Sequence, residues 1–127
     1  MSEYERDLAP LGPLAPVAVA LIEYAKALVP GANVVRRQTK WVVVPNFMAF
    51  RVPKRTREVI FSVYGHPKAF KKSPALGIYW DRSSYSEFRL DSARQLGAAA
   101  SYIATACQLS KFKRKSKPQL EDLASIL

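Results

Sequence analysis

The residues of this chain that could do catalytic or metal chemistry are few and lie far apart. The single histidine, His66, stands between Gly65 and Pro67 at a predicted turn, and the single cysteine, Cys107, lies in an alanine-rich segment. Zinc sites draw on several His or Cys ligands, and a thiol among alanines packs as a small hydrophobic group. We interpret His66 as a solvent-facing turn residue and Cys107 as part of the core. Neither predicts a catalytic residue, a metal site or a cofactor.

Two carboxylates near the end of the predicted strands offer the best alternative. Glu87-Phe88-Arg89 resembles the triplet of carboxylate, any residue and basic residue found in metal-dependent nucleases, and Asp81 lies close by in the sequence. Such triplets usually carry lysine where this chain has Arg89, and arginine does not lose its proton to act as a base. Whether Asp81 and Glu87 bind a metal ion stays open. Because the five glycines are isolated, no phosphate-cradling loop is present, and we favour a non-enzymatic function.

Basic residues interleaved with aromatic ones form the most prominent chemical pattern. Lysine and arginine side chains neutralise phosphates, so a surface rich in them suits nucleic acid, either DNA or RNA. The segment KFKRKSKP at residues 111–118 could be a solvated tail, a nuclear address in a eukaryote or a phosphate-binding arm, and the basic chain around it favours the arm. The predicted nucleic-acid-binding residues are Arg36, Arg37, Lys40, Arg51, Lys54, Arg55, Lys71, Lys72, Lys111, Lys113, Arg114, Lys115 and Lys117.

Aromatic side chains divide into predicted core residues and predicted stacking residues. Tyr and Trp are often only partly buried, and exposed rings stack on unpaired bases. The candidates for stacking are Trp41, Tyr79, Trp80 and Tyr85. The phenylalanines expected in the core are Phe47, Phe50, Phe61 and Phe88.

The positive charge is concentrated in the middle of the chain. Residues 30–117 hold eighteen basic and four acidic residues, a balance of +14, whereas residues 1–29 and 118–127 each have a balance of −2. Such a field attracts polyanions or acidic proteins and says nothing about the fold. A protein-interaction or assembly module with an acidic partner is therefore the alternative function. Its contact, and a possible homodimer, would involve Leu120, Leu123 and Leu127 of a tail helix, and a metal-dependent nuclease is the third hypothesis.

Composition bounds the class of protein. The chain has 127 residues, 49% of them hydrophobic, which suits one domain with an ordinary core. Its longest apolar stretch, residues 14–29, contains Glu23 and Lys26 and is too short to span a membrane. With one cysteine and no secretion-signal pattern, we expect a cytoplasmic protein, nuclear if the source is eukaryotic, without membrane insertion.

Periodicity and turn residues predict the elements that must position these side chains. An irregular lead-in over residues 1–15 is expected because it contains three closely spaced prolines or glycines before an apolar helical stripe begins. Ser92 and Gln95 have the spacing of a capping box at the start of a second helix. We predict one α+β domain over residues 16–110, with an N-terminal helix, a mainly antiparallel sheet of four to five strands and a C-terminal helix packed on the sheet. A basic linker and a short amphipathic tail helix are expected over residues 111–127.

The order of these patterns resembles a known family. The segments TKWVVVPN, the pair Asn46-Phe47, the alternating strand VIFSVYG and the strand-to-helix junction FRLDSARQL follow one another as they do in an uncharacterised domain labelled a "predicted transport protein". That domain is found alone or beside restriction-endonuclease-like modules. The resemblance covers about residues 16–109 and implies a compact α+β fold in a DNA-linked setting. It implies no active site.

Overall fold

The protein is an α+β domain in which helices cover one face of a six-stranded sheet. The computed structural model describes the backbone of residues 2–126 and the side chains of residues 2–112. The α+β class is confirmed, and the strand number is six rather than four or five. In chain order the elements are α1 (Glu3–Leu8), η1 (Ala9–Leu11), α2 (Leu14–Leu28), β1 (Asn33–Arg37), β2 (Lys40–Val44), β3 (Met48–Arg51), β4 (Val59–Tyr64), η2 (Pro67–Ala69), β5 (Tyr79–Arg82), β6 (Tyr85–Leu90), η3 (Ala93–Gln95) and α3 (Leu96–Ile126).

The sheet has the strand order β1-β2-β3-β4-β6-β5, and all neighbouring strands are antiparallel. The additional strand arises around Pro45, where the chain turns between β2 and β3. Pro45 and Asn46 lie in this turn, and β2 and β3 on either side of it pair as a hairpin inside the sheet. Proline has no N–H for a ladder and a fixed φ, so a turn satisfies it better than a strand interior.

The first residues are helical, contrary to the predicted irregular lead-in. Ser2 caps α1 by accepting a hydrogen bond from the Glu5 backbone N–H, and Tyr4 and Leu8 are buried against the rest of the domain. The prolines do not prevent this arrangement because Pro10 is the second residue of η1 and Pro16 falls in the first turn of α2, where no intrahelical N–H is needed.

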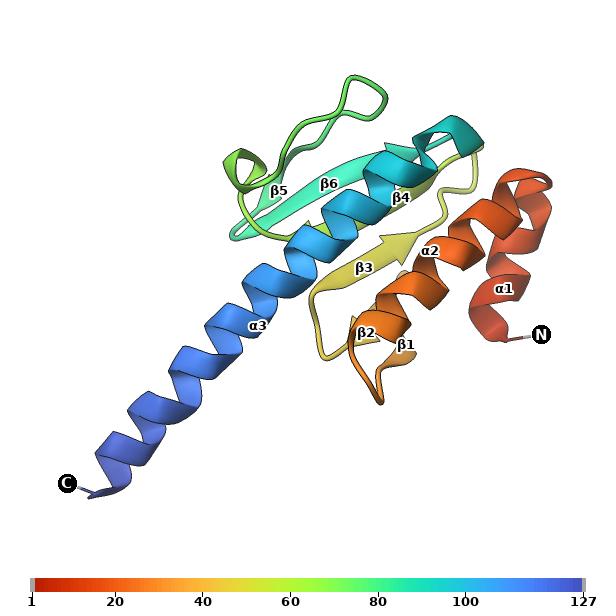
Figure 1. Cartoon of the computed structure of the whole chain (residues 1–127). Helices are drawn as coiled ribbons and strands as arrows, with labels where there is room; N and C mark the ends of the chain where they lie inside the picture. Colours follow the sequence, from red (N-terminus) through yellow and green to blue (C-terminus); the bar gives the residue numbers. More distant parts are fainter. Residues whose placement is uncertain (1, 127) are drawn as a thin grey trace.

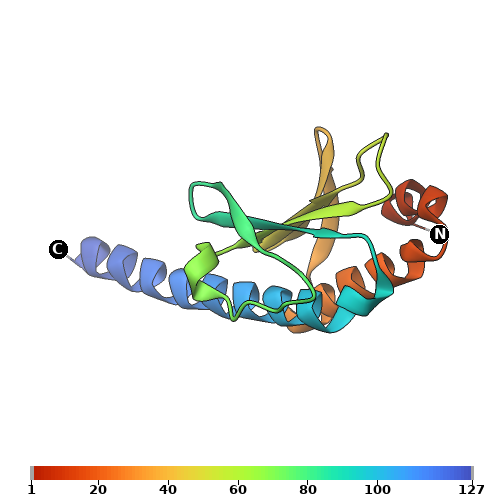
Figure 2. The same ribbon diagram turned by 90° about the horizontal axis from the view of Figure 1, so that it is seen from above.

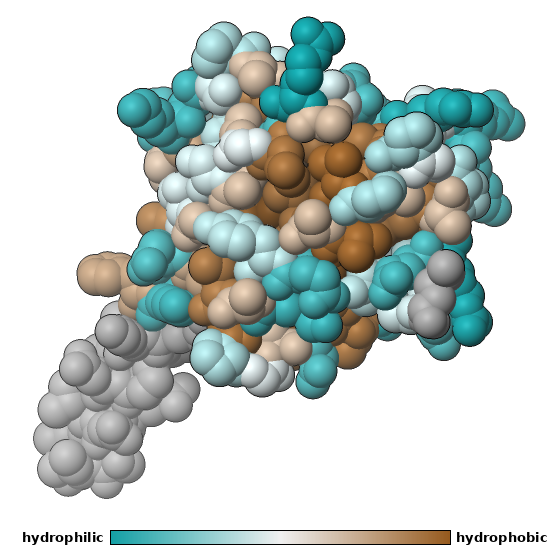
Figure 3. Space-filling view, turned by 45° about the vertical axis from the view of Figure 1, so that its right-hand side comes forward, coloured by the Kyte–Doolittle hydropathy of each residue, from teal (hydrophilic) through white to brown (hydrophobic). Residues whose placement is uncertain are grey.

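The core lies between the sheet and the helices α2 and α3, which run along one side of it, whereas α1 lies at the end of the sheet (Figures 1 and 2). Phe47, Phe50, Phe61 and Phe88 are fully or almost fully buried there, which confirms the predicted core phenylalanines. Cys107 is buried in the same cluster, as expected. On the outer surface of the helix-bearing side, hydrophobic residues gather in a central patch surrounded by hydrophilic ones (Figure 3).

The last helix differs from its prediction in length. Ser92 and Gln95 form the predicted capping box at the entry to η3 and α3. From there α3 continues to Ile126, so the basic segment is part of this helix rather than a linker before a separate tail helix. The side chains of Leu120, Leu123 and Leu127 lie outside the described residues, and the assembly hypothesis built on them stays a prediction. Over the described part of the chain, no helix is long and apolar enough to cross a membrane.

Candidate nucleic-acid interface

The side of the sheet away from the helices is open, and its residues alternate with those of the core (Figure 2). Register sorts the open-face residues into rows across the strands. One row pairs Ala49 with Ser62 and Ser62 with Glu87, and the adjacent row pairs Arg51 with Ile60 and Ile60 with Arg89. Small side chains therefore occupy the centre of the face, and long charged ones lie beside them.

A pocket of about 280 Å³ lies at this centre. Ala49 and Ser62 are too short to fill it, and Ile60, which the register places on the open face, is buried and lines it. We call this site the sheet pocket. Its lining residues are Gln38, Thr39, Lys40, Ala49, Phe50, Arg51, Ile60, Ser62, Asp81, Arg82 and Glu87.

A larger cleft of about 900 Å³ adjoins the sheet pocket and shares Thr39 and Arg51 with it. It lies between the end of α1, the β1–β2 hairpin and the loop from β3 to β4. We call it the basic cleft. It is lined by Asp7, Pro10, Leu11, Arg36, Thr39, Trp41, Arg51, Val52, Pro53, Lys54, Arg55, Thr56 and Arg57.

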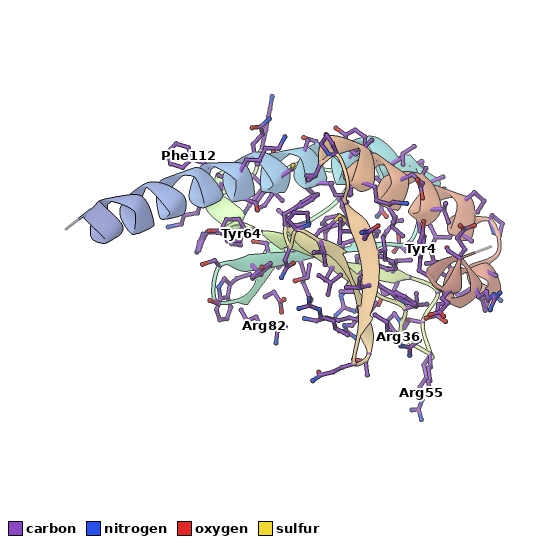
Figure 4. The ribbon with its side chains drawn as sticks, turned by 90° about the horizontal axis from the view of Figure 1, so that it is seen from below. Tyr4, Arg36, Arg55, Tyr64, Arg82 and Phe112 are labelled. Carbon is purple, nitrogen blue, oxygen red and sulfur yellow. The ribbon has the colours of Figure 1, made fainter. Side chains whose placement is uncertain are left out.

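The two sites together bring seven basic and three acidic side chains into one region. The cations come from β1, β2, β3, the β3–β4 loop and β5, and Figure 4 shows Arg36, Arg55 and Arg82 on the side of the ribbon away from α3. Within the described residues, only Arg36 of these cations has a carboxylate within 4.0 Å. Unpaired cations at a concave surface remain available to an anionic ligand. The seven are Arg36, Lys40, Arg51, Lys54, Arg55, Arg57 and Arg82.

Arg36 is held at the edge of the basic cleft by α1. Its Nη1 atom lies 3.6 Å from Asp7 Oδ2, and its guanidinium carbon lies 5.4 Å from the centre of the Trp41 ring. The same Asp7 oxygen accepts a hydrogen bond of 2.9 Å from Trp41 Nε1. One carboxylate thus fixes an arginine and a tryptophan that lie far from it in the sequence.

Helix α1 is itself anchored by a tyrosine. Tyr4 packs edge-on against Trp41 and Phe50 and donates a hydrogen bond of 2.6 Å to Glu23 Oε1 on α2. Burial and this bond raise the pKa of Tyr4 to about 12. The same bond is the main cause that lowers the pKa of Glu23. The neutral phenol and the ionised carboxylate are both favoured, which keeps α1 in place beside the basic cleft.

The predicted stacking residues have different surroundings. Trp41 is only 5% exposed and bonds Asp7, so the expectation that it is exposed is wrong, because the unpredicted α1 covers it. Tyr79 and Trp80 on β5 are 69% and 59% exposed. Tyr85 is half-buried and packs edge-on against Tyr64 with ring centres 5.7 Å apart. Tyr79 and Trp80 thus keep the exposure that stacking requires.

Not every predicted cation joins the basic cleft or the sheet pocket. Arg37 is the register partner of Lys40, which lines the sheet pocket, but Arg37 itself lines neither site. Lys71 and Lys72 are exposed but line neither site. Lys111 donates a hydrogen bond of 3.3 Å to the Leu28 carbonyl at the end of α2, which gives it a structural contact. The side chains of Lys113, Arg114, Lys115 and Lys117 fall outside the described residues.

The two carboxylates of the nuclease hypothesis do come together in the sheet pocket. Asp81 Oδ2 accepts a hydrogen bond of 2.9 Å from Ser62 Oγ, and Glu87 Oε1 lies 3.6 Å from Arg89 Nη2. Across residues 2–112, no group of three or more His, Cys, Asp or Glu side chains is placed to hold a metal ion. His66 is exposed, and its Nδ1 accepts the Lys68 backbone N–H at 3.3 Å as the cap of η2.

Sequence reasoning missed Arg57, Arg82 and the small residues that make the sheet pocket hollow. Arg57 lies close after the predicted cations Lys54 and Arg55, so its position in the sequence was a sufficient reason to predict it as well. Arg82 was not among the predicted cations, and only the pairing of β5 with β6 brings it into one pocket with residues from β2 and β3. Comparison of the chain with protein-family models, curated proteins and solved structures finds no match, so the resemblance to the transport-labelled domain stays a prediction.

Proposed function

We propose that this protein binds nucleic acid through the basic cleft, as a non-enzymatic module or an accessory of a nucleic-acid enzyme. One observation carries the proposal. Six cations without an acidic partner among the described residues gather with Arg36 around two adjoining hollows, one on the open face of the sheet and one at its end beside α1. A surface kept only for solubility gains nothing from such clustering, because like charges held close together repel.

The geometry suits a strand whose phosphates follow the cleft while a base turns toward the sheet. Arg51 lines both hollows, so it is placed to contact a phosphate between them. Tyr79, the register partner of Glu87 in the sheet pocket, offers an exposed ring on the same face of the edge strand β5, whereas the exposed Trp80 pairs with Ser86 on the opposite face. Exposed aromatic rings next to cationic grooves are typical of surfaces that bind unpaired bases.

The test is a titration of fluorescent short single strands and duplexes at low and high salt. The logarithm of the binding constant falls linearly with the logarithm of the salt concentration. Each neutralised phosphate contributes about −0.9 to this slope for a duplex and about −0.7 for a single strand. Four to seven contacts predict a loss of roughly 10²- to 10⁴-fold between about 50 and 200 mM salt. Affinity that does not change with salt would contradict the proposal.

A matched pair of double variants locates the interface. Arg51→Ala with Arg55→Ala removes two charges from the basic cleft and should reduce the salt slope by about two contacts and the affinity by at least about ten-fold. Lys71→Ala with Lys72→Ala removes the same charge from a loop that lines neither hollow. We expect this control to lose much less affinity, and equal losses in the two variants would show that net charge alone drives binding.

A metal-dependent nuclease is the second candidate, because Asp81 and Glu87 both line the sheet pocket beside Lys40 and Arg51. Cleavage of the bound strand on addition of Mg²⁺ or Mn²⁺, lost in both Asp81→Ala and Glu87→Ala, would support it. Cleavage that persists in both variants would exclude this pair of carboxylates.

A further inference from the structure

The sheet pocket has a mixed charge that phosphate binding alone does not explain. Asp81 and Glu87 stand within a strongly cationic region, where they would repel a phosphate that came close. A ligand that presents hydrogen-bond donors at this position, and its negative charge farther out, would satisfy both sets of residues. We propose that the sheet pocket binds a guanine base, with Asp81 and Glu87 accepting from its N1–H and its 2-amino group.

The size of the pocket fits a single planar base. Its volume of about 280 Å³ lies just below the range of sites for drug-sized ligands. Ala49, Ser62 and Ile60 line it without filling it. A base lying over Ile60 would find an apolar floor, which suits the face of a heterocycle.

The two carboxylates lie next to the same serine. Ser62 is the register partner of Glu87, and its Oγ donates to Asp81 Oδ2 at 2.9 Å. The Glu87 side chain is 26% exposed and is steadied by Arg89 at 3.6 Å. Both acids are therefore held in the pocket from different strands, and each keeps acceptor capacity because a carboxylate oxygen accepts more than one bond.

Chemistry selects guanine among the bases. A carboxylate only accepts hydrogen bonds, so two neighbouring carboxylates require two neighbouring donors. Guanine presents N1–H beside its 2-amino group, whereas adenine and cytosine each present one amino group beside an acceptor nitrogen, and uracil presents one N–H between two carbonyls. Arg82 in the same pocket can donate to the guanine O6 acceptor.

Lys40 and Arg51 are placed to hold a phosphate of the nucleotide that carries this base. Both line the sheet pocket, and Arg51 continues into the basic cleft. This inference rests on the proposed function where the guanine belongs to a strand. A free guanosine monophosphate would present the same base and phosphate, so the two sources must be separated by experiment.

The probes are short uridine strands with one central guanine, adenine or inosine, together with free GMP and AMP, each titrated against the full chain. Inosine keeps N1–H and O6 but lacks the 2-amino group. We expect the guanine strand to bind about ten-fold or more tightly than the adenine strand, with inosine between them. Equal affinity for all three strands would overturn the inference, and steep salt dependence in that case would leave the proposed function standing.

Isosteric variants assign the carboxylates. Asp81→Asn and Glu87→Gln should each reduce the preference for guanine over adenine to less than about three-fold, even though removing a negative charge raises the affinity for every strand. Glu3→Gln removes the same charge from an exposed position on α1 and should keep the preference. A preference unchanged in both pocket variants would overturn the assignment.

The nucleotide arms separate the two proposals. GMP bound over AMP without binding of any strand would support the pocket and contradict the proposed function. Strand binding with a guanine preference, but no detectable GMP binding, would support both and identify the strand as the source. If neither strands nor GMP bind, both proposals fail.

Discussion

The two faces of the sheet carry different kinds of side chain on one backbone. In the helix-covered row, Phe50 pairs with Phe61 and Phe61 with Phe88, and the rings lie 6.0 and 5.0 Å apart between centres. One residue away on the same three strands, the open row reads Ala49, Ser62 and Glu87. Because side chains alternate in a strand, stability and binding can be assigned to opposite faces without competing for positions.

The sharpest test of that division replaces neighbours on β4. Phe61→Ala removes a fully buried ring and leaves a cavity, so we expect a loss of about 3–5 kcal/mol in the free energy of unfolding. Ser62→Ala removes one hydrogen bond to Asp81 on the open face and should lose about 1 kcal/mol or less. Denaturant unfolding measures both, and similar losses would break the distinction between the faces.

Helix α1 links the covered face to the basic cleft, and its tyrosine should make stability depend on alkaline pH. The pKa of Tyr4 is about 12 in the folded protein and 10.0 for a free tyrosine. Because the pKa is raised in the folded state, the neutral phenol stabilises the fold below pH 10, and this contribution of roughly 2–3 kcal/mol is lost as the pH rises through 12. Tyr4→Phe should remove this part of the decline, whereas Tyr24→Phe at an exposed position should keep it.

The smallest expected effect concerns Asp7, the one acid among the described residues that lines the basic cleft. Asp7→Asn keeps an oxygen that can accept from Trp41 Nε1 but releases Arg36 from its partner at 3.6 Å. Exposed pairs of this kind are worth about 0.2–1 kcal/mol, so affinity for nucleic acid at low salt should rise by up to about five-fold. Glu3→Gln is the matched change on the same helix. A rise of the same size in both variants would place the effect in net charge rather than in the cleft.

Local patterns predicted much of the fold correctly. The core phenylalanines, the burial of Cys107 and the capping box of Ser92 and Gln95 are each determined by near neighbours in the sequence or by hydrophobicity. The errors lie where a short segment depends on distant partners. The segment over Glu3–Leu8 is too short to be a stable helix alone and forms because Tyr4 and Leu8 pack against the domain.

The candidate site was predictable only in part, for a related reason. Arg36, Lys40, Arg51, Lys54 and Arg55 were selected by charge and turn position, and the structure places all five around the basic cleft and the sheet pocket. Trp41 was predicted to be exposed, but it is buried because α1 covers it, and that helix was not predicted. Lys71 and Lys72 have the same chemistry and similar loops but line neither hollow. The positions of charged residues along the sequence do not predict which loops lie next to one another in the folded protein.

The sequence by itself determined the composition of this protein: a basic chain with alternating strands, an apolar core and a capped last helix. Hydrophobic periodicity and capping act within a few residues, so they can be inferred without coordinates. Tertiary structure alone decided that Arg82 from β5 would stand with Lys40 and Arg51, and that Ser62 would hold Asp81 beside Glu87. Those neighbours are set by strand order and register, which depend on contacts between segments far apart in the chain.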